Sequence, residues 1–446
     1  VSLELFDLSR RHKAAGFRRA AFLREAAQIE GVYVPSLYEV RYHADGTIAS
    51  VAPKDGAPAR VRKRLILDMD KAYYPDRFVV PFVEIVHDRA MSEIFRGCIR
   101  GCRFCQAGFI YRPVREKSAE TVDAQSRALC ENTGYEEFSL SSLSTSDYTE
   151  LERLLPMLLD WAEKEQTNIS LPSLRVDGFS EELAARLNIL RRSGLTFAPE
   201  AGTQRLRDAI NKNLSEPEIL ETAKRAFSAG WTAVKLYFMM GLPTETREDV
   251  AGIAALAQKI VNAYYANPNK PKGKGVNVSV SVSCFVPKPF TPFQWEPQDT
   301  VEELEAKQRH LRESVTTRKV SLHWHDAQVS FLEGVFARGD RRLCAAMEEA
   351  FRRGCKRDAW SEHFSLQTWL DVSRDLGIDP AFYANRRRDF AEILPWDHLD
   401  YGVTKAFLAA ENRRAHESVT TPNCRQACAG CGAARWKGGV CTDGRN

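Results

Sequence analysis

From about residue 90, the chain alternates between short apolar runs rich in β-forming residues and longer amphipathic runs with helical spacing. The six apolar runs are AMSEIF, YEEFSLSSLS, NISLPSLRVD, LTFAPEAG, TAVKLYFMMGLPTET and VNVSVSVSCFVPKPF. Consecutive β–α units with right-handed crossovers form a parallel sheet. Six units are too few for a closed eight-stranded barrel, so the pattern predicts an α/β fold with a partial (β/α)6 parallel barrel. Functional groups should gather at the C-terminal ends of its strands.

The two flanks of this repeat have a different pattern. Residues 1–30 have helical spacing, and the segment after them alternates β-rich runs with turn signals such as Ala44-Asp45-Gly46. After Pro297 the chain becomes helical and strongly charged, and it ends in a tail rich in glycine and cysteine. We therefore divide it into an N-terminal helix and β linker at 1–85 (the remnant of a preceding domain), a core at 86–300, and a mostly helical region with a cysteine-rich tail at 301–446.

Composition narrows the class of protein only slightly. The 446 residues are 44% apolar and 27% charged, as in ordinary globular proteins, and a net charge of +4 is too small to indicate nucleic acid by itself. No run approaches the twenty or so apolar residues of a membrane span, and the N-terminus lacks the apolar core of a signal peptide. We expect a cytoplasmic protein without membrane partners. Eleven cysteines in such a chain indicate metal or cluster ligands where they group together.

Three of these cysteines lie in the loop after the first predicted strand, in EIFRGCIRGCRFCQAGF. Cys98, Cys102 and Cys105 have the spacing C-x-x-x-C-x-x-C, with no fourth ligand close by. Thiolates select zinc or iron–sulfur centres, and a closed zinc site needs four ligands. Three ligands leave one metal position open for chemistry. The alternatives are a zinc knuckle or three unconnected cysteines in the core.

This spacing, with Phe104 just before the last cysteine and a β–α context, resembles the radical S-adenosylmethionine (radical SAM) superfamily. Further stretches are similar to one subgroup, namely LSSLSTSDY, FAPEAGTQRLRDAINKN, MMGLPTET and FVPKPFTPFQW. Members of that subgroup often carry an N-terminal domain similar to cobalamin-binding domains and look distantly like methylthiotransferases. The resemblance covers about residues 30–432. Residues 1–30 resemble only the end of that domain and its linker, so cobalamin is a doubtful cofactor here.

The resemblance implies a cofactor and a set of site residues. Cys98, Cys102 and Cys105 would ligate a 4Fe–4S cluster that cleaves S-adenosylmethionine (SAM) reductively to a 5′-deoxyadenosyl radical. Arg100 and Arg103 would balance cluster charge; a solvated loop face is the alternative for both. The other residues implied to bind cofactor or take part in catalysis are Phe104, Ser141, Ser142, Arg175, Glu200, Lys235, Tyr237 and Gly241.

Each of these residues has an expected role. Ser141 and Ser142, after the second strand, would accept from the amino group of SAM, and Arg175 would bind its carboxylate. Glu200 would bond ribose hydroxyls or substrate, although a charge favoured by a helix N-terminus explains it as well. Lys235 and Tyr237 share one face of the fifth strand and would line the barrel lumen. Gly241 would let adenine approach the backbone.

The C-terminal tail repeats the first cysteine spacing. Cys424, Cys428 and Cys431, with Cys441 further on, would hold zinc or a second iron–sulfur cluster, and a disordered tail with incidental thiols is the alternative. His323 and His325 have the spacing of a metal pair on a strand, but surface or core histidines are the favoured interpretation. The arginine runs at 341–342, 352–353 and 386–388 suit a basic face for RNA, although solvated helix faces are the commoner explanation.

Two functions follow as hypotheses. The first is a radical SAM enzyme that functionalises a C–H bond, by methylation or methylthiolation, of an RNA or ribosome-associated substrate. It would need a low-potential electron donor of the flavodoxin or ferredoxin type, and the resemblance also implies a radical-SAM-linked partner protein. The second is a non-catalytic iron–sulfur or zinc module associated with RNA.

Overall fold

The structure is a computed structural model of the full chain, and it describes residues 1–170, 195–270, 273–436 and 438–441. Its N-terminal part forms two helices and a small hairpin rather than the single helix expected for residues 1–30. Gly16, at φ +77°, lies between the two helices in the left-handed region that ends helices. The elements of this part are α1 (Ser2–Ala14), α2 (Arg19–Ala26), β1 (Tyr38–Tyr42), β2 (Ile48–Pro53) and β3 (Val61–Arg62).

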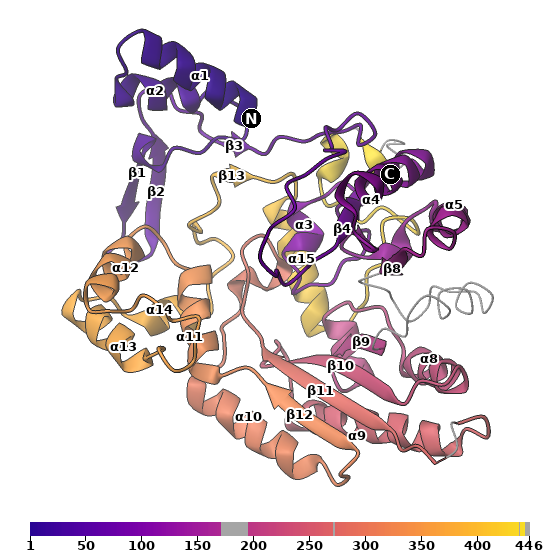
Figure 1. Ribbon diagram of the computed structural model, residues 1–446. Coiled ribbons are helices and arrows are strands. Elements are labelled where there is room, and N and C mark those ends of the chain that lie inside the picture. Colours follow the sequence, from indigo (N-terminus) through magenta and orange to yellow (C-terminus); the bar gives the residue numbers. More distant parts are fainter. Residues whose placement is uncertain (171–194, 271–272, 437, 442–446) are drawn as a thin grey trace.

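The core contains all six predicted strands, in order and parallel, which confirms the α/β class. Figure 1 shows the two sheets that they form. The first sheet has the strand order β4-β7-β8 and the second the order β12-β11-β10-β9. The strands are β4 (Ala90–Glu93), β7 (Glu137–Ser141), β8 (Asn168–Ser170), β9 (Leu195–Glu200), β10 (Ala233–Met240), β11 (Asn277–Cys284) and β12 (Val320–Trp324).

The seventh strand, β12, was not expected from the sequence. It pairs in parallel with β11, with Val320 opposite Val278 and Trp324 opposite Val282. A five-residue run between charged helices is too short to stand out by periodicity, and its position at the sheet edge depends on β11 being in place. No strand pairing joins the two sheets within the described ranges, so the barrel is an open one.

Helices cover one face of each sheet, and the alternation along the strands decides which face. In β10 the side chains of Val234, Leu236, Phe238 and Met240 are buried against helices, while Lys235 and Tyr237 point to the opposite, open face. The helices on the first sheet are α4 (Ala119–Thr133) and α5 (Leu151–Ala162). Those of the second half of the core are α7 (Gln204–Ala209), α8 (Glu216–Ser228) and α9 (Arg247–Ala266). Ser118 caps α4, and Ser215 caps α8 in a capping box.

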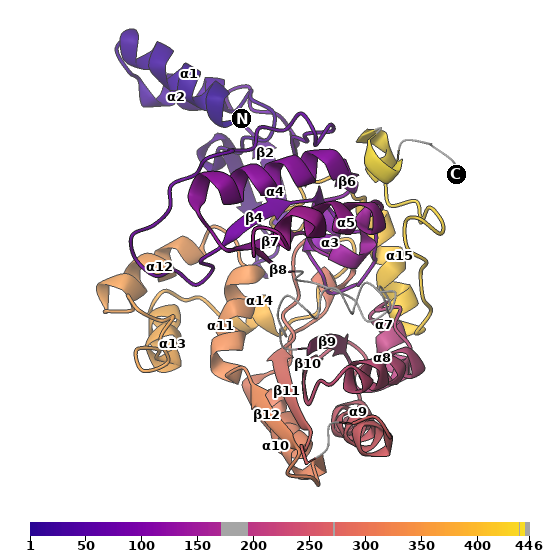
Figure 2. The ribbon, with the colours of Figure 1, turned by 45° about the vertical axis from the view of Figure 1, so that its right-hand side comes forward.

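The region after β11 is mostly helical, as expected. Figure 2 shows α11–α14 gathered beside the second sheet and α15 standing close to the cysteine loop region. Its elements are α10 (Val301–Ser314), α11 (Ala327–Ala337), α12 (Leu343–Arg352), α13 (Leu366–Asp375), α14 (Pro380–Ala384), β13 (Leu399–Asp400) and α15 (Lys405–His416). β13 pairs with β3, so residues near 60 and near 400 meet. The division into three domains remains a prediction.

Candidate active site

The three cysteines of the first motif lie on one loop between two short paired strands, β5 (Phe95–Arg96) and β6 (Arg115–Glu116). A short helix, α3 (Ala107–Ile110), follows Cys105. The loop directly follows β4, at the C-terminal end of the first strand of the core, where the fold places functional groups. Gly97, at φ +94°, begins the loop, and a Cβ there would lie 2.8 Å from the Tyr111 carbonyl oxygen. Only glycine fits this approach.

The three cysteines are partly buried, and this burial has a chemical consequence. Burial, followed by the charge of Cys102, raises the pKa of the Cys98 thiol to about 12. Burial is also the main cause that raises the pKa of Cys105. A metal therefore has to displace protons from these sulfurs to bind them. The Arg100 backbone N–H points to Cys98 Sγ at 3.4 Å, the kind of contact that stabilises a cluster sulfur.

The guanidinium of Arg100 is paired with a carboxylate, and its predicted effect on cluster charge remains a prediction. Its Nε donates to Asp147 Oδ2 at 2.9 Å and its Nη2 to the other oxygen of the same carboxylate. Asp147 is only 7% exposed and also accepts from Ser144 Oγ at 2.7 Å. This ion pair ties the cysteine loop to the segment after β7, which contains Ser141 and Ser142.

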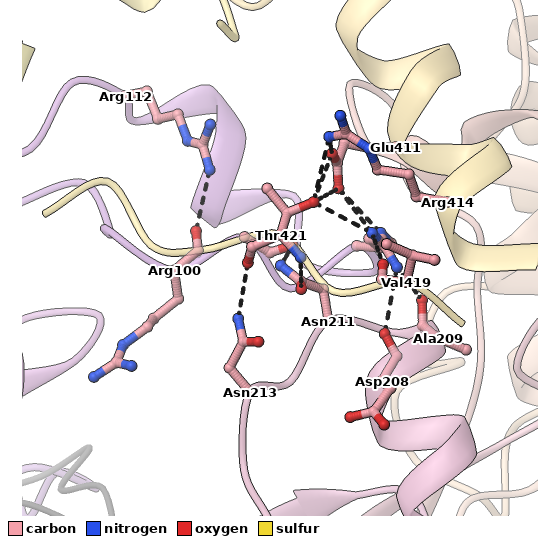
Figure 3. Close-up of polar contacts among 12 residues, drawn as sticks. Arg100, Arg112, Asp208, Ala209, Asn211, Asn213, Glu411, Arg414, Val419 and Thr421 are labelled. Carbon is pink, nitrogen blue, oxygen red and sulfur yellow. Dashed lines mark hydrogen bonds and ion pairs between the residues drawn. The ribbon is translucent and has the colours of Figure 1, made fainter. Parts of the chain in front are cut away.

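Arg103 is fully buried, so the alternative of a solvated loop face is wrong for it, while its effect on cluster charge remains a prediction. Its side chain is fully buried and its Nε donates to Glu411 Oε2 in α15 at 3.1 Å, while Nη1 donates to the Ala209 carbonyl at 2.8 Å and Nη2 to that of Val419 at 2.7 Å. Figure 3 shows the polar network in which these groups meet.

The same network fastens the C-terminal tail across the cysteine loop. Asn211 Nδ2 donates to the Gly101 carbonyl at 3.1 Å, and its Oδ1 accepts from the Thr421 backbone N–H at 2.8 Å (Figure 3). Thr421 Oγ1 donates to Glu411 at 2.8 Å. The cysteine loop is thus held by groups more than 100 and more than 300 residues away in the sequence. Asn211 was not predicted as a site residue, although it lies inside the quoted stretch FAPEAGTQRLRDAINKN.

Glu200 ends β9 with a left-handed backbone, φ +67°, and its carboxylate pairs with Lys212 Nζ at 3.1 Å. Both charges act on Cys105, which places the pair beside the cysteine loop. Glu200 was predicted as a site residue from the sequence, whereas Lys212 was not. The ion pair with Lys212 accounts for a carboxylate at this position without the helix N-terminus that was the alternative explanation. The predicted contact of Glu200 with ribose or substrate remains a prediction.

Gly241, another predicted residue, is held by a buried ion pair that follows it in the chain. The Gly241 N–H donates to Glu245 Oε1 at 2.9 Å, and Glu245 pairs with Lys307 Nζ at 2.7 Å. Burial raises the pKa of Glu245, although Lys307 and the Gly241 amide act against it. Gly241 has φ +83°, a left-handed backbone that favours glycine, and a Cβ there would lie 3.0 Å from Asp299 Oδ2. The predicted contact of Gly241 with adenine remains a prediction.

The remaining predicted residues lie in several places. Phe104 is partly buried against Ala201, Leu206 and their neighbours. Lys235 Nζ lies 4.8 Å from the ring centroid of Tyr237 on the open face of β10, and neither residue borders the cavity described next. Arg175 lies outside the described residues. The roles predicted for all these side chains remain predictions.

A cavity of about 730 Å³ adjoins the base of the cysteine loop. Gly97, Ser141, Ser142 and Tyr111 line it, together with the ion pair of Glu93 and Arg96. Ser142 Oγ lies 2.9 Å from Thr145 Oγ1. The two serines predicted to contact SAM therefore lie on a cavity that reaches the residue preceding Cys98.

Lys63 and Arg115 give the wall of this cavity an excess of positive charge. Lys63 Nζ donates to the carbonyl oxygens of Ile110 (2.7 Å) and Arg112, and Arg115 donates to the carbonyls of Pro113 (3.1 Å) and Ile66 (2.8 Å). Burial, with the charges of Arg115 and Arg435, lowers the pKa of Lys63 to about 8, so it stays mostly protonated at pH 7.

Most arginines of the three C-terminal runs are paired with carboxylates or buried, which agrees with the commoner of the two explanations, solvated helix faces, and leaves the basic face for RNA a prediction. Arg386 pairs with Glu392 at 2.7 Å, and Arg388 is buried with its guanidinium 5.4 Å from the centroid of Trp396. Arg352, Arg353 and Arg387 pair with Glu348, Glu349 and Glu296. The acidic partners of these arginines could not be assigned from the sequence.

The comparisons with known proteins agree with the family resemblance predicted from the cysteine loop. Residues 92–257 match the family model of the radical SAM superfamily. The chain carries a radical SAM domain. It is an enzyme of the radical SAM type, and its cofactors are a 4Fe–4S cluster and SAM. The buried thiol set, the amide donor to Cys98 and the adjoining cavity fit those cofactors.

Relatives of this radical SAM chain are found in Methanocaldococcus jannaschii. An uncharacterised protein of that archaeon is 29% identical over 338 residues, which are 76% of this chain and 70% of the relative. A candidate methylthiotransferase of the same organism is 25% identical over 164 residues, which are 35% of this chain and 36% of that protein. The chain thus matches only about a third of the length of the second relative.

Two similar solved structures are distant. The radical SAM methyltransferase TsrM from Kitasatospora setae, solved with cobalamin and a [4Fe–4S] cluster bound, has 15% identity and a TM-score of 0.36, covering 46% of this chain and 38% of that chain. Elp3 from Methanocaldococcus infernus has 13% identity and a TM-score of 0.31, covering 52% and 55%. TM-scores this low carry no argument about the reaction of this radical SAM enzyme.

Neither a preformed metal-binding group nor a membrane-spanning helix is found in the described part of the chain. Across the described ranges, no group of three or more His, Cys, Asp or Glu side chains is arranged to hold a metal ion, and His323 and His325 are no exception. The ligand roles of Cys98, Cys102, Cys105, Cys424, Cys428 and Cys431 therefore remain predictions. Within the same ranges, each helix is too short or too polar to cross a membrane.

Proposed function

We propose that this radical SAM enzyme methylates or methylthiolates a C–H bond of an RNA or ribosome-associated substrate. The observation that carries the proposal is the cavity beside the cysteine loop, which combines Ser141 and Ser142 with the cationic groups of Lys63 and Arg115. Such a wall suits an anionic substrate, and among the two substrate classes it favours RNA. The partial match to a candidate methylthiotransferase supports the reaction type.

In this proposal, the residues of the chain bind SAM and substrate and hold the cysteine loop in position. A 4Fe–4S cluster with SAM supplies one-electron cleavage of the sulfonium when both are bound. Ser141 and Ser142 accept from the amino group of SAM, and the Arg100–Asp147 pair keeps the cysteine loop and the serine segment in register. Lys63 and Arg115 line the cavity and contribute the positive charge that favours a phosphate there. A flavodoxin or ferredoxin is the proposed electron donor, and a radical-SAM-linked protein the proposed partner.

The experiment is anaerobic reconstitution of the full chain with iron and sulfide, followed by dithionite and SAM. We expect 5′-deoxyadenosine to form in the wild type and to be absent in Cys98→Ala, while Cys344→Ala, an exposed lone cysteine, behaves as wild type. The non-catalytic alternative predicts an intact cluster and no product.

The substrate is tested separately. Nucleosides of total RNA from a strain that lacks the gene are compared by mass spectrometry with those of the same strain complemented by the wild type or by Cys98→Ala. We expect one methyl or methylthio nucleoside to disappear and to return only with the wild type. An unchanged RNA profile would contradict the RNA substrate.

A further inference from the structure

The segment that joins α1 to α2 concentrates positive charge, and we call residues 10–24 the basic turn. It contains six arginine or lysine residues and no aspartate or glutamate, whereas the whole chain has a net charge of only +4, so the rest of the chain is net negative. All six side chains are exposed, namely Arg10, Arg11, Lys13, Arg18, Arg19 and Arg24. Figures 1 and 2 show α1 and α2 side by side, standing out from the sheets, with the turn at their outer end.

The cations of the basic turn lack the acidic partners that are typical of solvated helix faces. On α8, for comparison, Arg225 pairs with Glu221, four residues away, at 3.4 Å. Of the six cations, only Arg11 has an ion pair within the described ranges, with Glu25 at a distance of 4.0 Å. Positive charge that is not neutralised inside the protein is free to bind a polyanion.

Aromatic rings hold the basic turn in shape and leave one ring open to a ligand. The ring centroid of Phe22 lies 5.6 Å from that of His12 and 5.5 Å from that of Phe17. Phe17, next to Arg18 in the chain, is nevertheless 48% exposed. Proteins that bind single-stranded nucleic acid combine such exposed rings, on which bases stack, with cations that hold the phosphates. The basic turn presents both kinds of group on one rigid element.

The basic turn is connected by α1 to the cavity beside the cysteine loop. Glu4, in the first turn of α1, pairs with Arg64, which lines that cavity. Lys13, in the last turn of the same helix, is nine residues further on, which corresponds to about 14 Å along the helix axis. An RNA strand with one nucleotide in the cavity can therefore reach the basic turn with nucleotides further along the strand.

We propose that the basic turn is a docking surface for a single-stranded segment of the RNA substrate, held by its phosphates and by a base stacked on Phe17. This inference rests on the RNA substrate of the proposed function. Basic helices also bind anionic membranes, but such a helix needs an apolar face along the length that carries its cations. In α1 the exposed apolar residues, Leu3 and Phe6, come before the exposed cations Arg10 and Lys13, which favours RNA.

The test is the binding of a fluorescein-labelled single-stranded RNA of mixed sequence to the reconstituted full chain, measured by anisotropy over a range of salt concentrations. Arg18→Gln/Arg19→Gln should weaken binding roughly twentyfold at about 0.1 M salt. It should also lower the slope of log affinity against log salt by about 1.4, because each lost phosphate contact contributes about 0.7. The matched control is Lys224→Gln/Arg225→Gln, an adjacent exposed pair on α8, which should bind RNA as the wild type does.

A third variant separates base stacking from charge. Phe17→Leu keeps an apolar side chain against Phe22 but has no ring for a base, so it should weaken binding roughly tenfold without a change in the salt slope. Melting curves check that each variant folds as the wild type does. Wild-type affinity in Arg18→Gln/Arg19→Gln would overturn the inference, as would equal losses in the two charge variants. Binding to phosphatidylserine vesicles but not to RNA would also overturn it, and wild-type affinity in Phe17→Leu would overturn the stacked base.

The docking surface and the proposed function fail separately. Formation of 5′-deoxyadenosine without RNA should be the same in the wild type and in Arg18→Gln/Arg19→Gln, because neither residue lies at the cysteine loop. RNA binding that is lost in this variant, together with an unchanged nucleoside profile in the deletion strain, would count against the proposed function alone. A nucleoside that depends on the enzyme, together with wild-type RNA affinity in the variant, would count against the docking surface alone.

Discussion

Gly432 occupies a position in the tail that no side chain fits. Its φ is +97°, and a Cβ would lie 2.8 Å from Thr404 Cγ2 and 2.9 Å from the Gly402 carbonyl oxygen. Gly430, two residues earlier, also has a left-handed backbone, but a Cβ there would meet nothing within 4 Å. The two glycines therefore separate the cost of backbone conformation from the cost of steric overlap.

Replacing each glycine by alanine tests this difference. Gly430→Ala should lower the free energy of unfolding by about 1 kcal/mol, because only the left-handed backbone is strained. Gly432→Ala should cost about 2 kcal/mol more, because Thr404 and the Gly402 carbonyl have to move. Chemical denaturation measures both values, and limited proteolysis should cut the tail of Gly432→Ala first. Equal losses in the two variants would show that the tail does not lie against residues 402–404.

At the scale of elements, α15 and the cysteine loop are joined by a fully buried ion pair. Arg103 and Glu411 expose 0% and 2% of their side chains, and Glu411 also accepts from Thr421 Oγ1. Removing one member of a buried pair leaves the other charge unpaired in a place that water does not reach, which is far more costly than the loss of a surface pair.

Glu411→Gln should therefore destabilise the chain by about 3 kcal/mol and loosen the cysteine loop. We expect less iron at the loop after reconstitution and a lower yield of 5′-deoxyadenosine. The matched control is Glu348→Gln, in an exposed pair with Arg352, which should change stability by less than about 0.5 kcal/mol. Retention of wild-type stability and iron in Glu411→Gln would show that α15 does not hold the loop.

The sequence was sufficient for the elements that local periodicity encodes. The six strands of the core appeared as apolar runs separated by amphipathic helices, and the cysteine spacing located the loop of the candidate site. The partners of the loop could not be predicted, because Arg103–Glu411 and Asn211–Thr421 join residues about 300 and 200 positions apart and have no local pattern. The partners of Arg386 and Arg387 could not be predicted for the same reason, since Glu392 and Glu296 come next to them only in the folded chain.

At the scale of the whole molecule, His398 joins the N-terminal part to the C-terminal region. Its ring lies 4.7 Å from that of Tyr33 and 5.5 Å from that of Tyr38, and both ring nitrogens are buried without a hydrogen-bond partner in the described structure. Its backbone carbonyl accepts from the Val61 N–H at 2.9 Å, next to the pairing of β3 with β13. Protonation of this ring would place a charge in an aromatic setting with Arg341 nearby.

Burial, and then the charge of Arg341, lowers the pKa of His398 below its usual 6.5. The unfolded chain therefore binds a proton at a higher pH than the folded chain does, and stability must fall as the pH drops. The stabilising neutral form is fully present above pH 6.5, and its contribution is lost progressively below that value until the folded-state pKa is passed. We expect the melting temperature of the wild type to fall over this acidic window.

His398→Phe keeps an aromatic ring against Tyr33 and Tyr38 but cannot take up a proton, so its melting temperature should fall less between pH 7 and pH 5 than that of the wild type. His43→Phe, a change at a histidine for which no such burial applies, should leave the acidic loss as in the wild type. Parallel pH profiles for the wild type and His398→Phe would mean that the junction between the two ends of the chain does not depend on a neutral histidine.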